Sequence, residues 1–192
     1  MQRLDLASLP ERLAPGSRAA VLALLALGLE WTRTLAARQP ELAIPALVGG
    51  GAALSLLGLG FTLQELGLSR SRLAFRLLGG IALGAVLLLP TAVRRSPVPL
   101  LPVPFAAAAV AVSVGEEIAF RGALFAAIER WLGPAPAVLG SSLVFAAGHV
   151  LSHPPEFLVA VAATGTLLAV WRWACGDLVA PIVAHCLADL AL

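Results

Sequence analysis

The chain has 192 residues, of which 59% are hydrophobic and 12% are charged, with a formal net charge of +2. Soluble domains carry about 25% charged residues, so this composition excludes an ordinary soluble domain and indicates an integral membrane protein. All 13 basic residues are arginines that lie scattered through the sequence, which argues against a nucleic-acid partner because no clustered basic face is formed. The lipid bilayer is therefore the expected environment of the chain.

Seven apolar stretches predict an all-α fold, a polytopic transmembrane helical bundle of about seven helices. Before them, residues 1–17 mix leucines with charged residues, as in an amphipathic segment lying at the membrane interface. The predicted helices cover residues 18–35, 42–63, 73–93, 105–131, 137–151, 157–174 and 178–192. The fifth and seventh are short for unaided crossing, which suits helices surrounded by other helices.

Three of these stretches have features of their own. The first can also be read as a signal peptide, although Trp31 and Arg33 fit poorly before a cleavage site. The second is rich in glycine, which lets helices approach closely in lipid, so we expect a packing helix. A proline-rich connector at residues 96–104 cannot be regular helix. It divides the chain into N-terminal helices, residues 18–99, and a C-terminal helical core, residues 100–192.

The arginines predict an orientation in the membrane. With seven spans, the N-terminus and the loops after spans two, four and six share one side and hold eight arginines. The other side holds four, namely Arg33, Arg38, Arg94 and Arg95. This difference predicts a cytoplasmic N-terminus.

The two cysteines, Cys175 and Cys186, lie in apolar surroundings and are expected to be small buried residues, with a disulfide or redox pair as the alternative.

Two adjacent carboxylates and an arginine interrupt the fourth apolar stretch. Glu117 and Arg121 are four residues apart with the glutamate first, the favourable order for an ion pair on a helix. Glu116 points about 100° away around the helix and has no local partner of opposite charge. Because a charged group inside a bilayer costs a few kcal/mol, residues of this kind are kept when they pair, line a wet cavity or do chemistry.

Further ionisable groups lie in two later stretches. His149 follows Phe145 by four residues, and His185 precedes Asp189 by four. Three helices therefore bring polar groups to what we expect to be one site, since polar residues in lipid seek one another. A carboxylate with imidazoles can activate water and stabilise an oxyanion. The alternative is a set of interhelical hydrogen bonds that holds together a scaffold or a small ion-binding transporter, although the halves show no internal repeat.

Three motifs, E-E-x-x-x-R from Glu116 to Arg121, F-x-x-x-H from Phe145 to His149, and H-x-x-x-D from His185 to Asp189, resemble those of the CPBP family. This family of intramembrane proteases includes CAAX prenyl endopeptidases, bacteriocin-processing proteins and Abi proteins. The resemblance covers residues 100–192, and it implies an endopeptidase that cleaves a membrane-associated protein or peptide near the bilayer surface. The substrates that the resemblance allows are bacteriocin leaders, C-terminal membrane-sorting tails and lipidated C-termini. The short chain suits a dedicated processing or sorting enzyme of a prokaryotic inner membrane, of which the myxosortase-like branch is one example.

The resemblance also implies roles. Glu116 resembles the glutamate that activates water, with His149 assisting, and His185 resembles part of the oxyanion site. Glu117 and Arg121 resemble the family's structural pair. At position 189 the family has Asn most often, and an ionised Asp cannot donate the hydrogen bond that an amide donates.

The use of a metal by such proteins is disputed, and the sequence leaves it open. Glu116, His149, His185 and Asp189 offer the mixed nitrogen and oxygen ligands that Zn²⁺ accepts, and they can equally act as an acid–base set without metal. His153 has the spacing from His149 seen on zinc-binding helices, but Pro154 follows it, so a loop histidine is expected. A non-catalytic immunity or scaffold protein of the same fold is the main rival interpretation.

Overall fold

The computed structural model of the chain describes residues 14–69, 72–94 and 101–191, and every regular element within these ranges is helical. The all-α prediction is therefore confirmed. The elements are α2 (Pro15–Ala36), η2 (Pro40–Leu42), α3 (Ala43–Leu56), α4 (Leu73–Arg94), α5 (Val103–Glu116), η3 (Glu117–Leu124), α6 (Phe125–Leu132), α7 (Pro134–Gly148), η4 (His149–Leu151), α8 (Pro155–Cys175) and α9 (Val179–Leu190). Residues 1–13 of the predicted amphipathic segment and 96–100 of the proline-rich connector lie outside the described residues. The connector prediction is wrong for Val103 and Pro104, which begin α5, because a proline in the first helical turn needs no amide donor.

The described helices form seven rods, as the sequence predicts, because α5, η3 and α6 join into one continuous helix from Val103 to Leu132. The predicted end of the second span is wrong. Helix α3 ends at Leu56, and turns follow in which Gly60 and Gly67 have φ angles of 81° and 77°. Glycine adopts this left-handed conformation without steric cost, and it breaks the helix where the apolar pattern alone would continue it.

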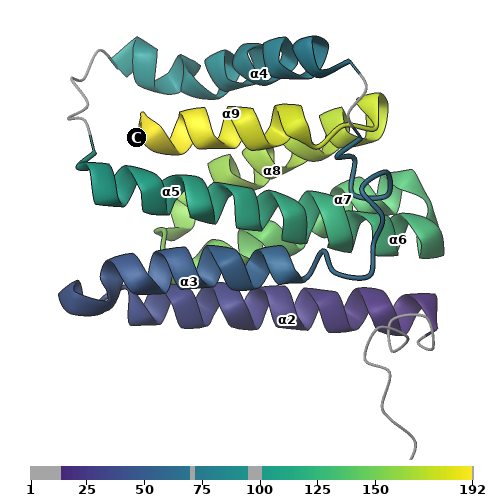
Figure 1. Cartoon of the computed structure of the whole chain (residues 1–192), viewed down its shortest axis with the longest axis horizontal. Helices are drawn as coiled ribbons and strands as arrows, with labels where there is room; N and C mark the ends of the chain where they lie inside the picture. Colours follow the sequence, from purple (N-terminus) through teal and green to yellow (C-terminus); the bar gives the residue numbers. More distant parts are fainter. Residues whose placement is uncertain (1–13, 70–71, 95–100, 192) are drawn as a thin grey trace, which may run out of the picture.

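The rods run side by side in two layers (Figure 1). One layer contains α4, α9, the continuous rod of α5 and α6, α3 and α2, each packed against the next, and α7 and α8 lie behind this layer. Helix α2 also packs against α6 and α7, which closes the bundle on one side. Polar groups on α2, α5, α7 and α9 therefore face a common interior.

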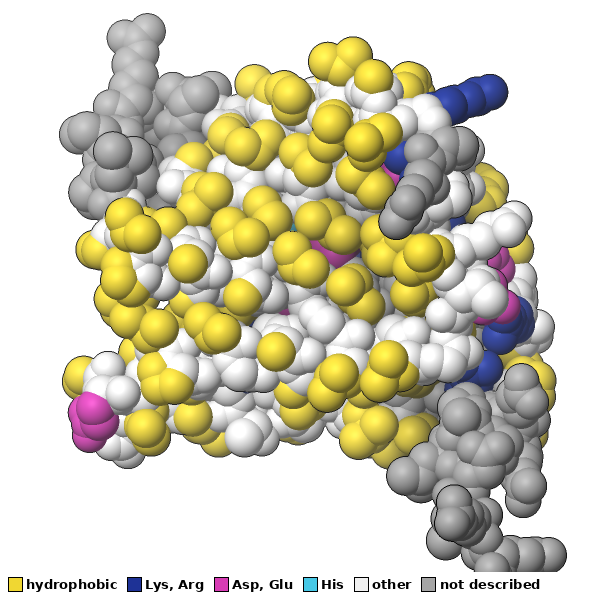
Figure 2. All heavy atoms as spheres, in the orientation of Figure 1, with side chains coloured by type: hydrophobic (Ala, Val, Ile, Leu, Met, Phe, Trp, Pro, Cys, Tyr) yellow, Lys and Arg dark blue, Asp and Glu magenta, His cyan; other side chains and the backbone are white. Residues whose placement is uncertain are grey.

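Among the described residues, four helices are long and apolar enough to cross a bilayer, namely Pro15–Ala36, Val103–Leu132, Pro134–Leu151 and Pro155–Cys175. The expectation that the fifth predicted helix is too short is therefore wrong, because this helix begins three residues earlier than predicted. Figure 2 shows hydrophobic side chains spread over the middle of one face, while arginines gather at one edge. Leu24, Leu78 and Val159 are among the large apolar side chains on the outside. This surface is what a lipid-embedded protein requires, since lipid tails cover apolar groups without cost.

Two glycines bring α3 and α5 into contact just before the glutamate pair. A Cβ atom added to Gly51 would lie 2.3 Å from the carbonyl oxygen of Ala111, and one added to Gly115 would lie 2.2 Å from the carbonyl oxygen of Gly51. Backbone meets backbone here, so only glycine fits at either position. The predicted glycine-rich packing helix is confirmed, and its contact with α5 lies directly before Glu116.

Asp177, in the turn between α8 and α9, connects α4, α8 and α9. Its carboxylate accepts hydrogen bonds from the backbone amides of Val179 and Ala180, which caps the start of α9, and from Trp171 Nε1. Arg76 Nε lies 3.5 Å from the same carboxylate, which connects α4 to the start of α9.

The expectation of buried cysteines is wrong for Cys175, which is exposed at the end of α8. Cys186 is half-buried, and both thiols are free.

Candidate active site

The glutamate pair lies where an ordinary α-helix changes into a π-helix. Glu116 is the last residue of α5, and Glu117–Leu124 form the π-helical segment η3. A π-helix has hydrogen bonds from i to i+5, is rare, and occurs frequently at functional sites. All but one of its eight residues are buried, so the widened turn lies in the centre of the bundle. Nothing in the sequence pattern indicated this change of helix type.

Glu117 and Arg121 form the predicted ion pair. Arg121 Nη1 donates to Glu117 Oε1 at 2.9 Å, and both side chains are fully buried. The guanidinium also lies 3.9 Å above the ring of Phe145, a cation–π contact from α7. Gly165 of α8 leaves room for the guanidinium, since an added Cβ would lie 3.1 Å from Arg121 Nη2.

The His185 ring is held by the same glutamate. Its Nδ1 lies 2.8 Å from Glu117 Oε1. A carboxylate that already receives a hydrogen bond from an arginine is an acceptor, so Nδ1 carries the proton and donates it. The other ring nitrogen, Nε2, then lies 3.6 Å from Glu116 Oε2. Glu117 thus orients His185 toward Glu116.

His149 is held by its own helix. Its Nδ1 lies 2.8 Å from the carbonyl oxygen of Phe145, which can only accept, so this nitrogen also carries a proton. Its Nε2 lies 3.9 Å from Glu116 Oε2. The rings of Phe145 and His149 are 4.4 Å apart, which packs the imidazole in place.

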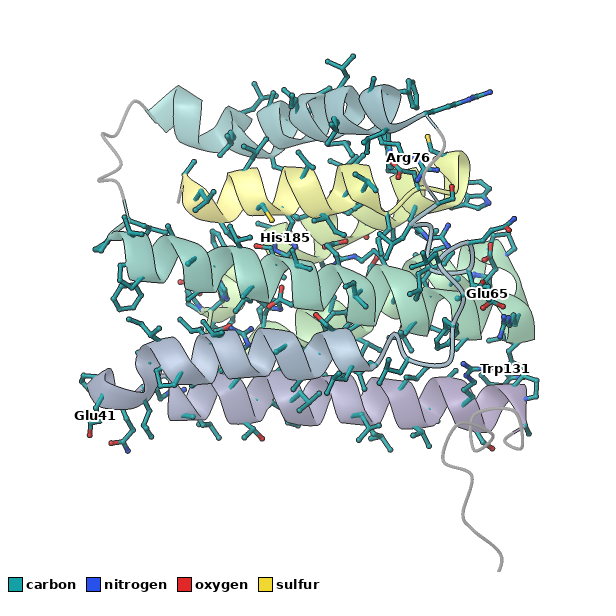
Figure 3. The ribbon with its side chains drawn as sticks, viewed as in Figure 1. Glu41, Glu65, Arg76, Trp131 and His185 are labelled. Carbon is teal, nitrogen blue, oxygen red and sulfur yellow. The ribbon has the colours of Figure 1, made fainter. Side chains whose placement is uncertain are left out.

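One oxygen of Glu116 therefore faces the Nε2 atoms of two histidines from two other helices. Both distances are too long for direct hydrogen bonds and short enough for a shared water molecule. Figure 3 shows His185 between α9 and α5, inside the bundle. The three motifs meet in space, as the sequence predicts.

Asp189 lies at the edge of this cluster. Its Oδ2 is 2.8 Å from Ser113 Oγ and 3.6 Å from His185 Nε2. Its side chain is 30% exposed, whereas those of Glu116, His149 and His185 are 10% exposed or less. Asp189 thus lies between the buried cluster and the end of the bundle. The contact with Ser113, which is 76 residues earlier, was not predicted.

Sequence reasoning missed two members of the cluster, Glu30 and Arg33 of α2. Arg33 Nη2 donates to Glu116 Oε1 at 2.8 Å and also contacts Glu30 Oε2. Glu116 does have a partner of opposite charge, but it comes from 83 residues away. The available signal was that both residues interrupt an apolar span, where charged groups are rare. The assignment of Arg33 to a loop in the arginine count is wrong, because its side chain points into the bundle.

His153 is a loop residue, as predicted. Its ring stacks on Phe157 with the centroids 5.1 Å apart, and Ser152 Oγ lies 2.9 Å from its Nδ1. Burial and the nearby His149 lower the pKa of His153 below its ordinary value, and the charge of Asp189 acts in the opposite direction.

The described residues do not fit a metal site as they stand. Among them, no group of three or more His, Cys, Asp or Glu side chains is arranged to hold a metal ion. In addition, Arg33 binds the Oε1 atom of Glu116 and already supplies a cation to that carboxylate.

A carboxylate facing two imidazoles, within a bundle of apolar helices, is the arrangement that activation of water requires. Residues 98–191 match the family model described as type II CAAX prenyl endopeptidase Rce1-like. The resemblance to CPBP proteins is thereby confirmed. No curated protein and no solved structure matches the chain. The four long apolar helices and the match to a membrane-protease family model indicate an integral membrane protein.

Proposed function

We propose that the protein is an endopeptidase in which Glu116 activates water to hydrolyse a peptide bond of a membrane-associated protein. The observation that supports this most strongly is the convergence of His149 Nε2 and His185 Nε2 on one oxygen of Glu116. A water molecule at that place has a carboxylate to take its proton. It also has imidazole nitrogens to orient it, which is the arrangement that general base catalysis requires.

In the proposed reaction, the water oxygen forms a bond to the carbonyl carbon of the peptide while its proton passes to Glu116 Oε2. The resulting oxyanion is stabilised by His185 Nε2–H when that ring is doubly protonated, a state that the nearby carboxylates of Glu117, Glu116 and Asp189 favour. The C–N bond then breaks, and Glu116 returns the proton to the leaving amine. His149 orients the water through its unprotonated Nε2. One carboxylate and one amine are formed.

The proposed substrates are proteins or peptides held at the membrane. Candidates are bacteriocin leaders, lipidated C-termini and the C-terminal sorting tails that a myxosortase-like enzyme would process. The exposure of Asp189 supports entry of the substrate from the end of the bundle where α7 and α9 finish.

We further propose that this end faces away from the cytoplasm of a prokaryotic cell. Helix α2 starts at the other end, where Arg18, Arg76, Arg130 and Arg172 also lie on the described helices. Arg33 lies inside the bundle and is not a loop arginine, and the same holds for the buried Arg76 and Arg172 at this end. Among the described side chains, the excess rests on Arg18, Arg72 and Arg130, against Arg38 at the opposite end. Positive loops stay in the cytoplasm, so the N-terminus is placed there and the site opens on the opposite side.

The test compares cells that carry the wild type, Glu116→Gln or a deletion, with uncleaved membrane precursors measured by mass spectrometry of protein termini. We expect the same precursors to accumulate in the Glu116→Gln and deletion strains, with normal insertion of the variant. Unchanged processing in Glu116→Gln would show that Glu116 is not the base. If deletion itself leaves all precursors unchanged, the non-catalytic immunity or scaffold function is favoured, and Glu116 is then a structural ion-pair partner.

A further inference from the structure

We propose that Arg33 of α2, held by Glu30, is a positioning residue for the catalytic glutamate. This inference rests on the proposed function of Glu116 and adds to it a pair from outside the segment that matches the family. It assigns a role in the site to the N-terminal half of the chain, which otherwise supplies only packing helices.

The geometry is that of one guanidinium nitrogen between two carboxylates. Arg33 Nη2 donates to Glu116 Oε1 at 2.8 Å and contacts Glu30 Oε2. The side chain of Arg33 is 10% exposed, that of Glu30 is 1% exposed and that of Glu116 is 2% exposed. In a buried environment of low dielectric constant, a charge-assisted hydrogen bond is short and strong.

The consequence for Glu116 is that its two oxygens have different tasks. Oε1 is occupied by Arg33, and Oε2 is left to face the histidines. A guanidinium stays protonated under all physiological conditions, so Arg33 favours the ionised form of the carboxylate that a base must have. It also restrains rotation of the carboxylate, so that Oε2 stays directed toward the histidines.

The fold leaves room for this pair at two glycines. A Cβ atom added to Gly50 of α3 would lie 2.5 Å from Arg33 Cδ and 2.9 Å from Arg33 Cβ. One added to Gly148 of α7 would lie 3.2 Å from Glu30 Cγ. By contrast, nothing lies within 4 Å of a Cβ added to the neighbouring Gly49. Of these two adjacent glycines, Gly50 thus lies against Arg33 and Gly49 does not.

Helix α2 is also fixed along its length at this point. Trp31 Nε1 donates to the carbonyl oxygen of Ala147 at 3.1 Å, and Arg38 Nη2 donates to that of Leu151 at 2.9 Å. Both acceptors flank His149 in the sequence. The register of α2 against α7 therefore determines the positions of both Arg33 and His149 relative to Glu116.

The experiment uses the purified full-length protein in detergent and a fluorogenic peptide that spans the cleavage site of the precursor accumulating with Glu116→Gln. Arg33→Ala is expected to lower kcat about 100-fold with little change in KM, because a misplaced base loses the aligned geometry. Arg33→Lys should retain part of the activity. Guanidinium ions at a non-denaturing concentration should restore part of the kcat of Arg33→Ala, with sodium chloride at equal ionic strength as control.

Gly50→Ala and Gly49→Ala form a matched pair that leaves every charge in place. We expect Gly50→Ala to lower kcat and Gly49→Ala to leave it unchanged, with thermal unfolding measured for both. This pair decides the question if Arg33→Ala fails to fold. Wild-type kcat in Arg33→Ala, or equal kcat in the two glycine variants, would overturn the inference while the loss of cleavage in Glu116→Gln still upholds the proposed function. Cleavage by Glu116→Gln would instead reject the proposed function itself.

Discussion

Glu117 Oε1 lies 2.8 Å from His185 Nδ1, so the carboxylate that forms the local ion pair with Arg121 also fixes a histidine 68 residues later. Glu117 Oε1 therefore accepts hydrogen bonds from both Arg121, which stabilises the bundle, and His185, whose ring faces the candidate catalytic glutamate. The same atom explains why the structural pair and the candidate catalytic residues are adjacent in the sequence.

The first prediction concerns this buried pair. Arg121→Met leaves Glu117 with an uncompensated charge and is expected to lower the free energy of unfolding by about 3–5 kcal/mol. Adding Glu117→Gln removes that charge while its amide oxygen still accepts from His185 Nδ1, so the double variant should regain most of the stability. Denaturant unfolding of the detergent-solubilised protein measures both. A double variant no more stable than Arg121→Met would contradict the assignment of Glu117 and Arg121 as a charge pair.

The second prediction concerns Asp189. Asparagine keeps an oxygen that can accept from Ser113 Oγ and adds an N–H donor near His185. Asp189→Asn is therefore expected to retain cleavage within about tenfold, whereas Asp189→Leu, which loses all polar contacts, should lower kcat by about 10² to 10³. The measurement is peptide cleavage by the two variants at matched folding. If Asp189→Leu cleaves as well as the wild type, the residue has no part in the reaction.

The third prediction concerns the contact of α3 with α5. Gly115→Ala brings a Cβ onto the backbone of Gly51, which can yield only if a whole helix shifts. We expect a loss of stability of about 1–3 kcal/mol, the range for overpacked sites, together with reduced cleavage because Glu116 follows directly. Gly28→Ala is the control, since nothing lies within 4 Å of its added Cβ. Equal thermal stability of the two variants would mean that the close approach of α3 and α5 is wrong.

The fourth prediction concerns orientation. Cys175 is exposed near the arginine-rich end, and Glu41 is exposed at the other end (Figure 3). In a Cys186→Ala background, a membrane-impermeant maleimide should label Cys175 only in inverted vesicles. After Glu41→Cys and Cys175→Ala, it should label the new thiol from outside in spheroplasts. The reverse pattern would place the N-terminus outside and the site toward the cytoplasm.

The fifth prediction concerns metal. Since Arg33 holds one oxygen of Glu116 and the described residues show no three-ligand group, prolonged treatment with a chelator should leave kcat within about twofold of the untreated enzyme. Peptide cleavage before and after chelation provides the measurement. Loss of activity that Zn²⁺ alone restores would show that Glu116, His149, His185 and Asp189 rearrange around an ion.

The sequence by itself determined the fold class, the seven helical rods and the residues of the three motifs. These follow from local properties, since apolar length predicts a membrane helix and an ionisable residue within it stands out. The pair of Glu117 and Arg121 was predictable for the same reason, because four residues along a helix fix which side chains meet. The early end of α3 is not predictable in this way, because a glycine-rich apolar stretch is compatible with a continuous packing helix, whereas Gly60 and Gly67 form turns in the structure.

Only the tertiary structure decided which partners these groups find on other helices. The contact of Arg33 with Glu116, that of His185 with Glu117 and that of Ser113 with Asp189 each join helices far apart in the sequence. Such pairs depend on the rotation and register of one helix against another, which hydrophobic periodicity leaves undetermined. The π-helical turn at Glu117–Leu124 changes that rotation within a single helix. Because it shifts every later residue around the axis, packing rather than pattern determined which side chains face the site.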